Sequence, residues 1–343
     1  MLKNILILIH LYFIISDVIA GSNSFIYRND SSIVNDSCKI QLYFGGDVTF
    51  ANHFERFVGH NYQYAFGKLD WFKQADLSMV NLENPLTKRG RPVEKQFNFR
   101  ALPEYTQILK QAGIDIVTIA NNHIYDYSDQ GLFDTVDYLD SSGIDHVGAG
   151  RSLTAARKPV IYDIKGVKIG FLAYYGLHKH SDCHPATVDS AGTALRKLSY
   201  INEDIKKLKE NADFIIVNFH WGMEKENLPG EDQIDFAHRV IDFGADLIVG
   251  HHPHVLQGIE IYKDKAIVYS LGNFIFGGNS RKTYQTAVLG VEIKNCDTGG
   301  FFKINPIPIR VDYWQPYKAQ KSDSLQIMQN LIDYSSIFEQ SIF

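Results

Sequence analysis

Cysteine, excess positive charge and long apolar runs are all scarce in this sequence of 343 residues. Its three cysteines, Cys38, Cys183 and Cys296, do not form a disulfide framework, so a hydrophobic core has to stabilise the fold. One disulfide could form in an exported protein, but the sequence does not say which pair. Lys and Arg number 34 against 39 Asp and Glu, a formal net charge of -5. This balance leaves no basic field for a polyanion and argues against nucleic-acid binding as the main task.

No apolar run reaches the ~20 residues that a membrane-spanning helix needs. The most apolar stretch lies at the N-terminus, where Lys3 precedes a run from Ile5 to Ile15 and Ala20 precedes Gly21. This pattern is typical of a secretory signal peptide over residues 1–20, and it predicts export to the periplasm, the cell envelope or the exterior. The alternative is an uncleaved N-terminal membrane anchor. No cysteine follows the run, so a lipoprotein anchor is not indicated.

Strand-like and helix-like segments alternate after this leader, which favours an α/β fold with a largely parallel core sheet. We expect strands over 39–47, 77–83, 114–123, 145–150, 159–176 (two strands about a turn), 213–222 and 246–254, and helices over 103–113, 129–143, 201–212 and 232–245. The later segments 265–276, 284–293 and 301–316 suggest a second sheet beside the first. We expect one domain over 39–316, a flexible lead-in over 21–38 and a helical tail over 317–343.

Polar side chains stand where several of the strand-like runs end. They are Asp47, Glu83, Asn121, Asn122, His123, His220, His252 and His254. Ligands of open α/β sheets bind at the carboxyl ends of the strands, so we expect these side chains to converge there. Carboxylates and imidazoles suit divalent manganese, zinc or iron, and the set contains no cysteine. The sequence therefore predicts a centre of one or two divalent metal ions at that edge.

Each of these residues also has a structural explanation when it is taken alone. His252 and His254 could be solvated histidines in a turn, and His220 could be a satisfied core histidine. Asn122 could cap a helix, although a cap leaves the neighbouring histidine unexplained. Glu83 could be a turn residue. Their joint occurrence at strand ends favours the metal centre.

Seven short motifs occur in an order that closely resembles the CapA family of bacterial poly-γ-glutamate (capsule) biosynthesis proteins, which are related to the calcineurin-like metallophosphatases. The motifs are GGDVTF, VNLENPLT, IANNHIYDY, GAG, FHWG, GHHPH and YSLGNFIF, and the resemblance covers about residues 39–316. It implies a four-layered α/β/β/α sandwich of mixed sheets, with helices on the outer faces and a metal site at the strand ends.

The resemblance also implies a role for each site residue. His123 matches the general acid, and the metal ligands would be Asp47, Glu83, Asn122, His220, His252 and His254. Residues that would support the ligands or contact substrate are Asn81, Asn121, His251 and Asn273. Alternate residues of an extended loop project the same way, so His252 and His254 would both reach the metal while His251 points elsewhere. Asn273 could instead bond backbone.

Three positions depart from the metallophosphatase pattern. Thr49 stands where the D-x-H motif usually carries a histidine ligand, Glu83 replaces an aspartate, and Asn121 replaces the glycine of G-N-H. A two-metal centre with one weakened position is the expectation.

The function implied by the resemblance is an exported, metal-dependent hydrolase that acts in the synthesis, release or anchoring of an anionic capsule polymer. Membrane-bound synthase or export subunits would be its partners. One alternative is an extracytoplasmic phosphoesterase that acts on nucleotides or sugar phosphates. Another is a non-catalytic scaffold subunit of a capsule synthase, which the missing D-x-H histidine favours.

Two further stretches remain open. Basic residues flank the Glu83 loop and either meet a polyanion or form an ordinary solvated face; they are Arg89, Arg91, Lys95 and Arg100. The histidine-rich segment LHKHSDCH, residues 177–184, is expected to be a flap near the site or a plain loop rather than a separate metal site.

Overall fold

The computed structural model describes residues 25–28, 39–176, 182–278, 281, 283–296 and 299–343. The predicted signal peptide lies outside the described residues. Within the predicted lead-in, the structure describes strand β1 (Phe25–Arg28), which pairs antiparallel with β16. No helix in the described part of the chain is long and apolar enough to cross a membrane. Cys183 is a free, half-buried thiol.

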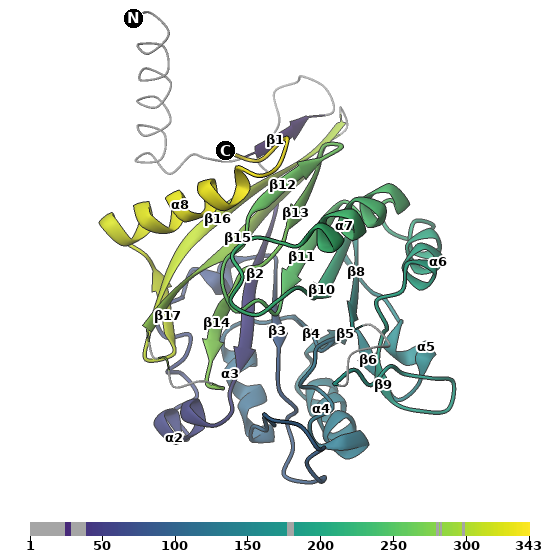
Figure 1. The fold of residues 1–343 in the computed structure, drawn as a ribbon, viewed down its shortest axis with the longest axis vertical. Coiled ribbons are helices and arrows are strands. Elements are labelled where there is room, and N and C mark those ends of the chain that lie inside the picture. The colour runs from purple at the N-terminus through teal and green to yellow at the C-terminus, as the bar shows by residue number, and fades with distance from the viewer. Residues whose placement is uncertain (1–24, 29–38, 177–181, 279–280, 282, 297–298) are drawn as a thin grey trace, which may run out of the picture.

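A nine-stranded mixed sheet forms one half of the molecule (Figure 1). Its centre is parallel and contains β2 (Lys39–Thr49), β3 (Leu77–Leu82), β4 (Ile116–Thr118), β5 (Asp145–Val147) and β14 (Asn273–Phe276). Three antiparallel strands extend it beyond β2: β15 (Thr283–Cys296), β16 (Gly299–Asp312) and β17 (Gln315–Lys318).

A six-stranded sheet faces the first. Its order is β12 (Ile259–Tyr262), β13 (Lys265–Val268), β11 (Leu247–His251), β10 (Phe214–His220), β8 (Val167–Tyr175) and β7 (Val160–Ile164). The inner four strands are parallel, and β7 and β12 are antiparallel strands at the edges. A short pair, β6 (Ala149–Gly150) and β9 (Gly192–Thr193), lies outside both sheets.

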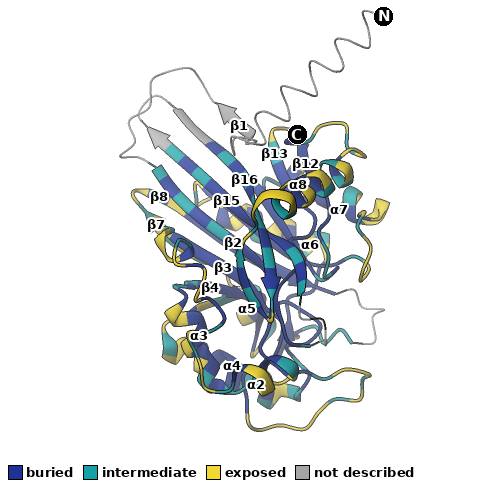
Figure 2. Ribbon diagram, turned by 90° about the vertical axis from the view of Figure 1, so that its left-hand side faces the viewer, coloured by how far each residue is buried: buried dark blue, intermediate teal, exposed yellow. Residues whose placement is uncertain are grey.

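Burial on both faces explains why the central strands read as nearly continuous apolar runs. Strand β10, FIIVNFH, and its neighbour β11, LIVGH, are buried along their whole length. Figure 2 shows buried residues along most of the strands and exposed residues mainly on the helices and loops. One core lies between the two sheets, and it includes Leu42 and Phe44 from the first sheet and Ile216 and Val249 from the second.

Helices cover the two outer faces through separate apolar cores. On the first sheet lie α2 (His53–Val58), α3 (Thr106–Gln111) and α4 (Ser128–Ser142), with the 3-10 turns Phe72–Gln74 and Pro103–Tyr105. On the second lie α5 (Leu153–Ala156), α6 (Leu198–Leu208) and α7 (Glu231–Phe243). The predicted four-layered α/β/β/α sandwich is confirmed.

Two expectations about the later strands are wrong. The segment 265–276 is not one strand, because the chain turns at Gly272 (φ 70°) and leaves the second sheet after β13 to join the first as β14. The later segments also do not build a separate second sheet, since β15 and β16 continue the first. Hydrophobic periodicity identifies a strand, but it does not say which strand is its partner.

Helix α8 (Lys321–Ser335) closes an open side of the sandwich, beside β16 and β12 (Figure 1). Its residues Ile327, Met328 and Leu331 are buried in the core between the sheets. The hydroxyl of Ser335 accepts a hydrogen bond from the backbone N–H of Ile259 at 2.8 Å. The helix is therefore part of the packed core.

We predict that Leu331→Ala lowers the free energy of unfolding by about 2–5 kcal/mol, because it empties part of that core. Leu325 is the matched control on the same helix, since its side chain is 47% exposed against 1% for Leu331. Leu325→Ala should change stability by less than about 0.5 kcal/mol. Urea unfolding followed by circular dichroism measures both, and equal effects would contradict the packing described for α8.

Candidate metal centre

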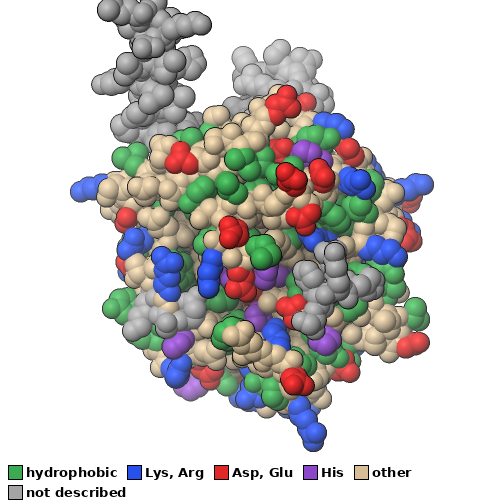
Figure 3. All heavy atoms as spheres, in the orientation of Figure 1, with side chains coloured by type: hydrophobic (Ala, Val, Ile, Leu, Met, Phe, Trp, Pro, Cys, Tyr) green, Lys and Arg blue, Asp and Glu red, His purple; other side chains and the backbone are tan. Residues whose placement is uncertain are grey.

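The carboxyl ends of strands from both sheets meet at one edge of the sandwich. Asp47 lies near the end of β2 and is paired with Asn81 of β3, and Glu83 follows β3 directly. From the second sheet, His220 ends β10 and pairs with His251 at the end of β11. Figure 3 shows histidine side chains in a hollow near the middle of this face, with acidic and basic side chains around it.

A β-bulge in the GGD motif turns Asp47 toward the second sheet. Phe44 packs into the core between the sheets and Val48 into the core under the helices, although strict alternation would put both on one face. The register shift between Phe44 and Asp47 accounts for this change of phase. Gly46 is required there, because a Cβ on it would lie 1.9 Å from the carbonyl oxygen of Gly272.

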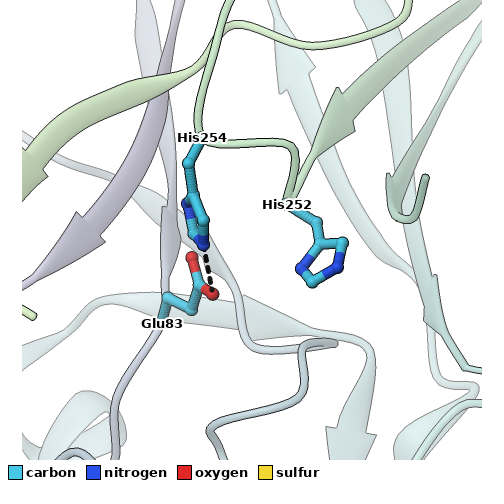
Figure 4. Close-up of side chains that lie close together, drawn as sticks. All are labelled: Glu83, His252 and His254. Atoms are coloured by element: carbon cyan, nitrogen blue, oxygen red, sulfur yellow. Dashed lines mark ion pairs between the residues drawn. The ribbon is translucent and has the colours of Figure 1, made fainter. Parts of the chain in front are cut away.

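Glu83 lies at the centre of the site and its side chain is fully buried. One carboxylate oxygen, Oε1, is 3.5 Å from His220 Nε2 and 3.8 Å from His254 Nε2. Figure 4 shows His254 above Glu83 and His252 beside it, both from the loop that follows β11.

Asp47 is the second carboxylate of the site. Its Oδ2 is 3.1 Å from His254 Nδ1, and its Oδ1 accepts a hydrogen bond from Asn81 Nδ2 at 2.8 Å. The backbone N–H of His252 also donates to Asp47 Oδ2, at 3.3 Å. The two carboxylates are thus linked through one imidazole.

Two sets of side chains have the geometry to hold a cation. The first set is Asp47, Glu83 and His220. The second set is Glu83, His252 and His254. Within each set the ligand atoms all lie within 4.8 Å of one another. Both sets include Glu83, so they share this carboxylate. Asn122 joins them, because its Oδ1 is 2.8 Å from His220 Nε2. The structure therefore brings together all six of the residues predicted as ligands.

Burial sets the charge state of these groups. It raises the pKa of Glu83 well above its usual value, and the charges of Asp47 and Glu224 raise it further. Burial also acts to raise the pKa of Asp47, but the nearby imidazoles of His251 and His254 outweigh it and hold that pKa well below the ordinary value.

His220 and His252 stay neutral for the same reason. Burial lowers the pKa of His220 well below its usual value, and burial together with His254 lowers the pKa of His252 to about 3. Neutral imidazole is the form that coordinates a metal.

Several buried polar atoms at this site have no hydrogen-bond partner among the described residues. They are Glu83 Oε1, His251 Nδ1, His252 Nδ1 and Asn273 Oδ1. Buried polar groups are nearly always paired, and each of these atoms can offer a lone pair. These atoms could therefore be satisfied by a cation or by hydrogen-bond donors, and a divalent metal ion fits this requirement.

The loop that carries the histidine pair is not extended, so the reasoning from alternate residues is wrong. Both His252 (φ 97°) and His254 (φ 59°) have left-handed backbone, which is uncommon for residues other than glycine. The turn still directs both imidazoles to Glu83. His251 does not point elsewhere, because its Nδ1 is 3.5 Å from Asp47 Oδ1.

Asn121 fixes the loop after β4. Its Nδ2 donates to Asn81 Oδ1 and to the carbonyl oxygen of Leu82, while its Oδ1 accepts the backbone N–H groups of His123 and Ile124. The predicted strand 114–123 consequently stops at Thr118, since the amide replaces ladder bonds.

His123 is held by Asp126 and Phe99, which the sequence reasoning missed, and by Lys95, which it named among the basic residues. Its Nδ1 lies 2.7 Å from Asp126 Oδ2, and the Phe99 ring stacks on the imidazole at 4.0 Å. Lys95 Nζ donates to the other Asp126 oxygen at 2.7 Å and to the Asn122 carbonyl oxygen at 2.7 Å. The His-x-x-Asp spacing in IANNHIYDY is the signal that could have identified Asp126.

The other three basic residues of the Glu83 loop lie at the surface. Arg89 pairs with Asp134, and the Arg100 guanidinium lies 4.5 Å from the centre of the Tyr127 ring. The Arg91 side chain is exposed. Of the four predicted basic residues, Lys95 is the one that touches the site.

Thr49 does not take the place of a histidine ligand. Its Oγ1 donates to the backbone oxygen of Glu83 at 3.3 Å, so it supports the turn that carries the carboxylate. Asn273 pairs with Asp47 in the ladder between β14 and β2, which places it beside the site.

The histidine-rich connection after β8 is described from residue 182 onward. His178 and His180 lie outside the described residues, so a metal site there stays untested. Tyr175 forms a hydrogen bond with Asp182 and packs edge-on against His220 at 5.5 Å, while His184 stacks on Tyr125 at 4.3 Å. The described end of this segment therefore lies next to the candidate centre.

Comparison with known proteins gives the following matches. The model of the family described as "Bacterial capsule synthesis protein PGA_cap" matches residues 41–278. The PGA biosynthesis protein CapA of Bacillus subtilis (strain 168) is 34% identical over 263 residues, 76% of this chain and 68% of that protein. The capsule biosynthesis protein CapA of Bacillus anthracis is 30% identical over 288 residues, 81% and 69% of the two chains.

A solved structure with a distant likeness is the NAD nucleotidase NadN of Haemophilus influenzae. It is 12% identical, covers 88% of this chain and 64% of that one, and has a TM-score of 0.46.

We predict that Glu83→Gln stabilises the metal-free protein at neutral pH. The ordinary pKa of a glutamate is 4.5, and folding raises the pKa of Glu83 well above it. Above pH 4.5 this carboxyl therefore lowers the stability of the folded state, because burial opposes its ionisation. The neutral amide of glutamine removes that cost. The difference between variant and wild type should shrink as the pH falls below about 4.5. Thermal melting in excess chelator measures it.

Added divalent metal should reverse this order, because a cation that binds the folded state raises the melting temperature of the wild type more than that of the variant. If the variant is less stable than the wild type in chelator at neutral pH, the claim that the buried Glu83 carboxylate destabilises the metal-free protein is wrong.

Proposed function

Because this chain belongs to the PGA_cap family of bacterial capsule synthesis proteins, which confirms the resemblance drawn from its motifs, we propose that it is a metal-dependent hydrolase of the CapA type. Its substrate would be an anionic capsule polymer such as poly-γ-glutamate, and it would act in the synthesis, release or anchoring of that polymer. The observation that carries the proposal is the buried Glu83 carboxylate, whose Oε1 lacks a hydrogen-bond partner and faces His220 and His254.

The donor set supports one or two divalent cations. Asp47, Glu83 and His220, with the amide oxygen of Asn122, would hold one ion. His252 and His254 would share Glu83 to hold the other. Oxygen and nitrogen donors without thiolate suit manganese, zinc or iron. Thr49 removes one ligand from the usual metallophosphatase pattern, so the first ion would depend more strongly on Asn122 and Glu83.

His123 is the proposed general acid. The Asp126 carboxylate accepts the Nδ1 proton, which orients the ring and leaves Nε2 to exchange a proton with a leaving group. Lys95 and the backbone N–H of Phe99 both donate to Asp126, so the dyad is held rigidly. The metal would supply Lewis acidity, by lowering the pKa of a water and polarising the scissile bond.

Export remains part of the proposal. It is supported by the lysine-led apolar run at residues 1–20, which is followed by small residues. A protein that acts on a capsule polymer would meet its substrate at the cell envelope, where membrane-bound synthase or export subunits would be its partners. The metal's identity and these partners are open to direct test.

We predict that the purified chain shortens poly-γ-glutamate when manganese or zinc is present. His123→Gln should slow the reaction by about 10²–10⁴-fold, the usual contribution of a general acid, while the metal content stays unchanged. Asp126→Asn should also slow it and should change its pH profile, because the imidazole loses its charged partner. Chain length is measured by size-exclusion chromatography, and new amine ends are counted to confirm cleavage.

Phosphate release from an aryl phosphate, with no effect on the polymer, would instead support the extracytoplasmic phosphoesterase. Thr49 is the observation that favours a non-catalytic scaffold, since it contributes no ligand. The scaffold would be supported if cells carrying His123→Gln made normal amounts of capsule polymer while cells lacking the protein made none.

A further inference from the structure

A cleft of about 440 Å³ opens beside the candidate metal centre, and His254 lines both. Three parts of the chain form its walls. The loop between β11 and β12 contributes Val255 and Leu256, the first sheet contributes Tyr284 and Gln285, and α8 contributes Asn330 and Tyr334. A substrate held at His254 could therefore extend from the metal centre into this cleft.

The charge of the cleft differs from that of the protein as a whole. The chain carries a formal net charge of -5, yet none of the described residues that line the cleft carries a carboxylate. Two arginines, Arg281 and Arg310, line it together with amide and hydroxyl side chains. Guanidinium groups are the side chains best suited to bind carboxylates. An anionic ligand would thus meet cations and hydrogen-bond donors there.

The positions of these donors are set by secondary structure. Gln285 and Arg310 are direct cross-strand partners of β15 and β16. Asn330 and Tyr334 are four residues apart on α8, so they lie on one face of that helix. The Tyr284 hydroxyl accepts a hydrogen bond from the backbone N–H of Phe276, which leaves its own proton free to donate. These donors therefore stand on strands or on a helix, whereas Arg281 precedes β15.

Arg310 is also held in place from outside the cleft. Its Nε is 3.3 Å from Asp312 Oδ1, and its Nη1 is 3.6 Å from Asp323 Oδ1. A guanidinium has five N–H donors, so these two contacts leave others for a ligand.

We propose that this cleft binds a segment of a polyanionic chain through at least two of its carboxylates, next to the bond held at the metal centre. This inference rests on the proposed function and adds where the substrate is held: the cleft would bind repeated carboxylates of a polymer, which a small ester with one anionic group does not have. Because the arginines are partly open to solvent, their attraction for the chain falls as the salt concentration rises.

Binding, measured without turnover, tests the proposal. Fluorescence anisotropy of a labelled γ-linked glutamate decamer is followed with the full chain, with and without manganese, and free glutamate is the competitor. We expect the decamer to bind and free glutamate to compete poorly. The double variant Arg281→Gln/Arg310→Gln should bind the decamer roughly 5–30-fold more weakly, since two exposed charge contacts are lost.

Two further variants test whether a loss of binding comes from the cleft itself and not from a change in folding or in the overall charge of the protein. Asn330→Asp adds a carboxylate to the cleft and keeps the oxygen that accepts a hydrogen bond from Gln326, so it should weaken decamer binding without unfolding the helix. Arg239→Gln removes an exposed arginine from α7, away from the cleft, and should leave binding unchanged. Melting temperatures confirm that all variants are folded.

The outcomes separate this inference from the proposed function. If neither the double variant nor Asn330→Asp weakens binding, or if the wild type does not bind the decamer, the cleft proposal is overturned whatever metal the protein holds. If the decamer binds through the arginines but the protein holds no metal, the cleft proposal stands and the hydrolase proposal fails.

Discussion

Glu83 is a fully buried carboxylate with one oxygen that no donor in the described part of the chain satisfies, and the rest of the site is arranged around it. Its pKa is raised by burial, and His220 of the second sheet, whose imidazole is kept neutral by burial, faces it. Leaving such a group buried costs folding free energy unless a cation binds. The geometry of the site is therefore that of a receptor for positive charge, built at the expense of the stability of the metal-free chain.

The four-layered sandwich makes that arrangement possible. Each sheet alone offers only part of the ligand set, because Asp47 and Glu83 belong to the first sheet and His220 and His254 to the second. The apolar core between the sheets holds the two edges in register, and α8 closes that core on one side. The same helix forms a wall of the arginine-lined cleft, so the packing that stabilises the fold also shapes the surface next to the metal centre.

Much of this could be predicted from the sequence, for identifiable reasons. Residues such as Asp47 and His220 end apolar runs, and parallel strands bring their carboxyl ends to one edge, so their convergence followed from local pattern. What depended on tertiary structure could not be predicted. The left-handed backbone at His252 and His254 and the split of residues 265–276 between two sheets depend on neighbours far away in the sequence. The contact of Asp126 with His123 is different, because the two residues are three positions apart and the spacing was there to be read.

The most direct test of the central claim is the number of metal ions bound per chain, measured by elemental mass spectrometry on the wild type, Glu83→Ala and His220→Ala. If Glu83 bridges two ions, the wild type holds two, Glu83→Ala loses both, and His220→Ala loses one. A folded wild-type chain that holds no metal after incubation with manganese or zinc, or a Glu83→Ala variant that keeps the full complement, would contradict it.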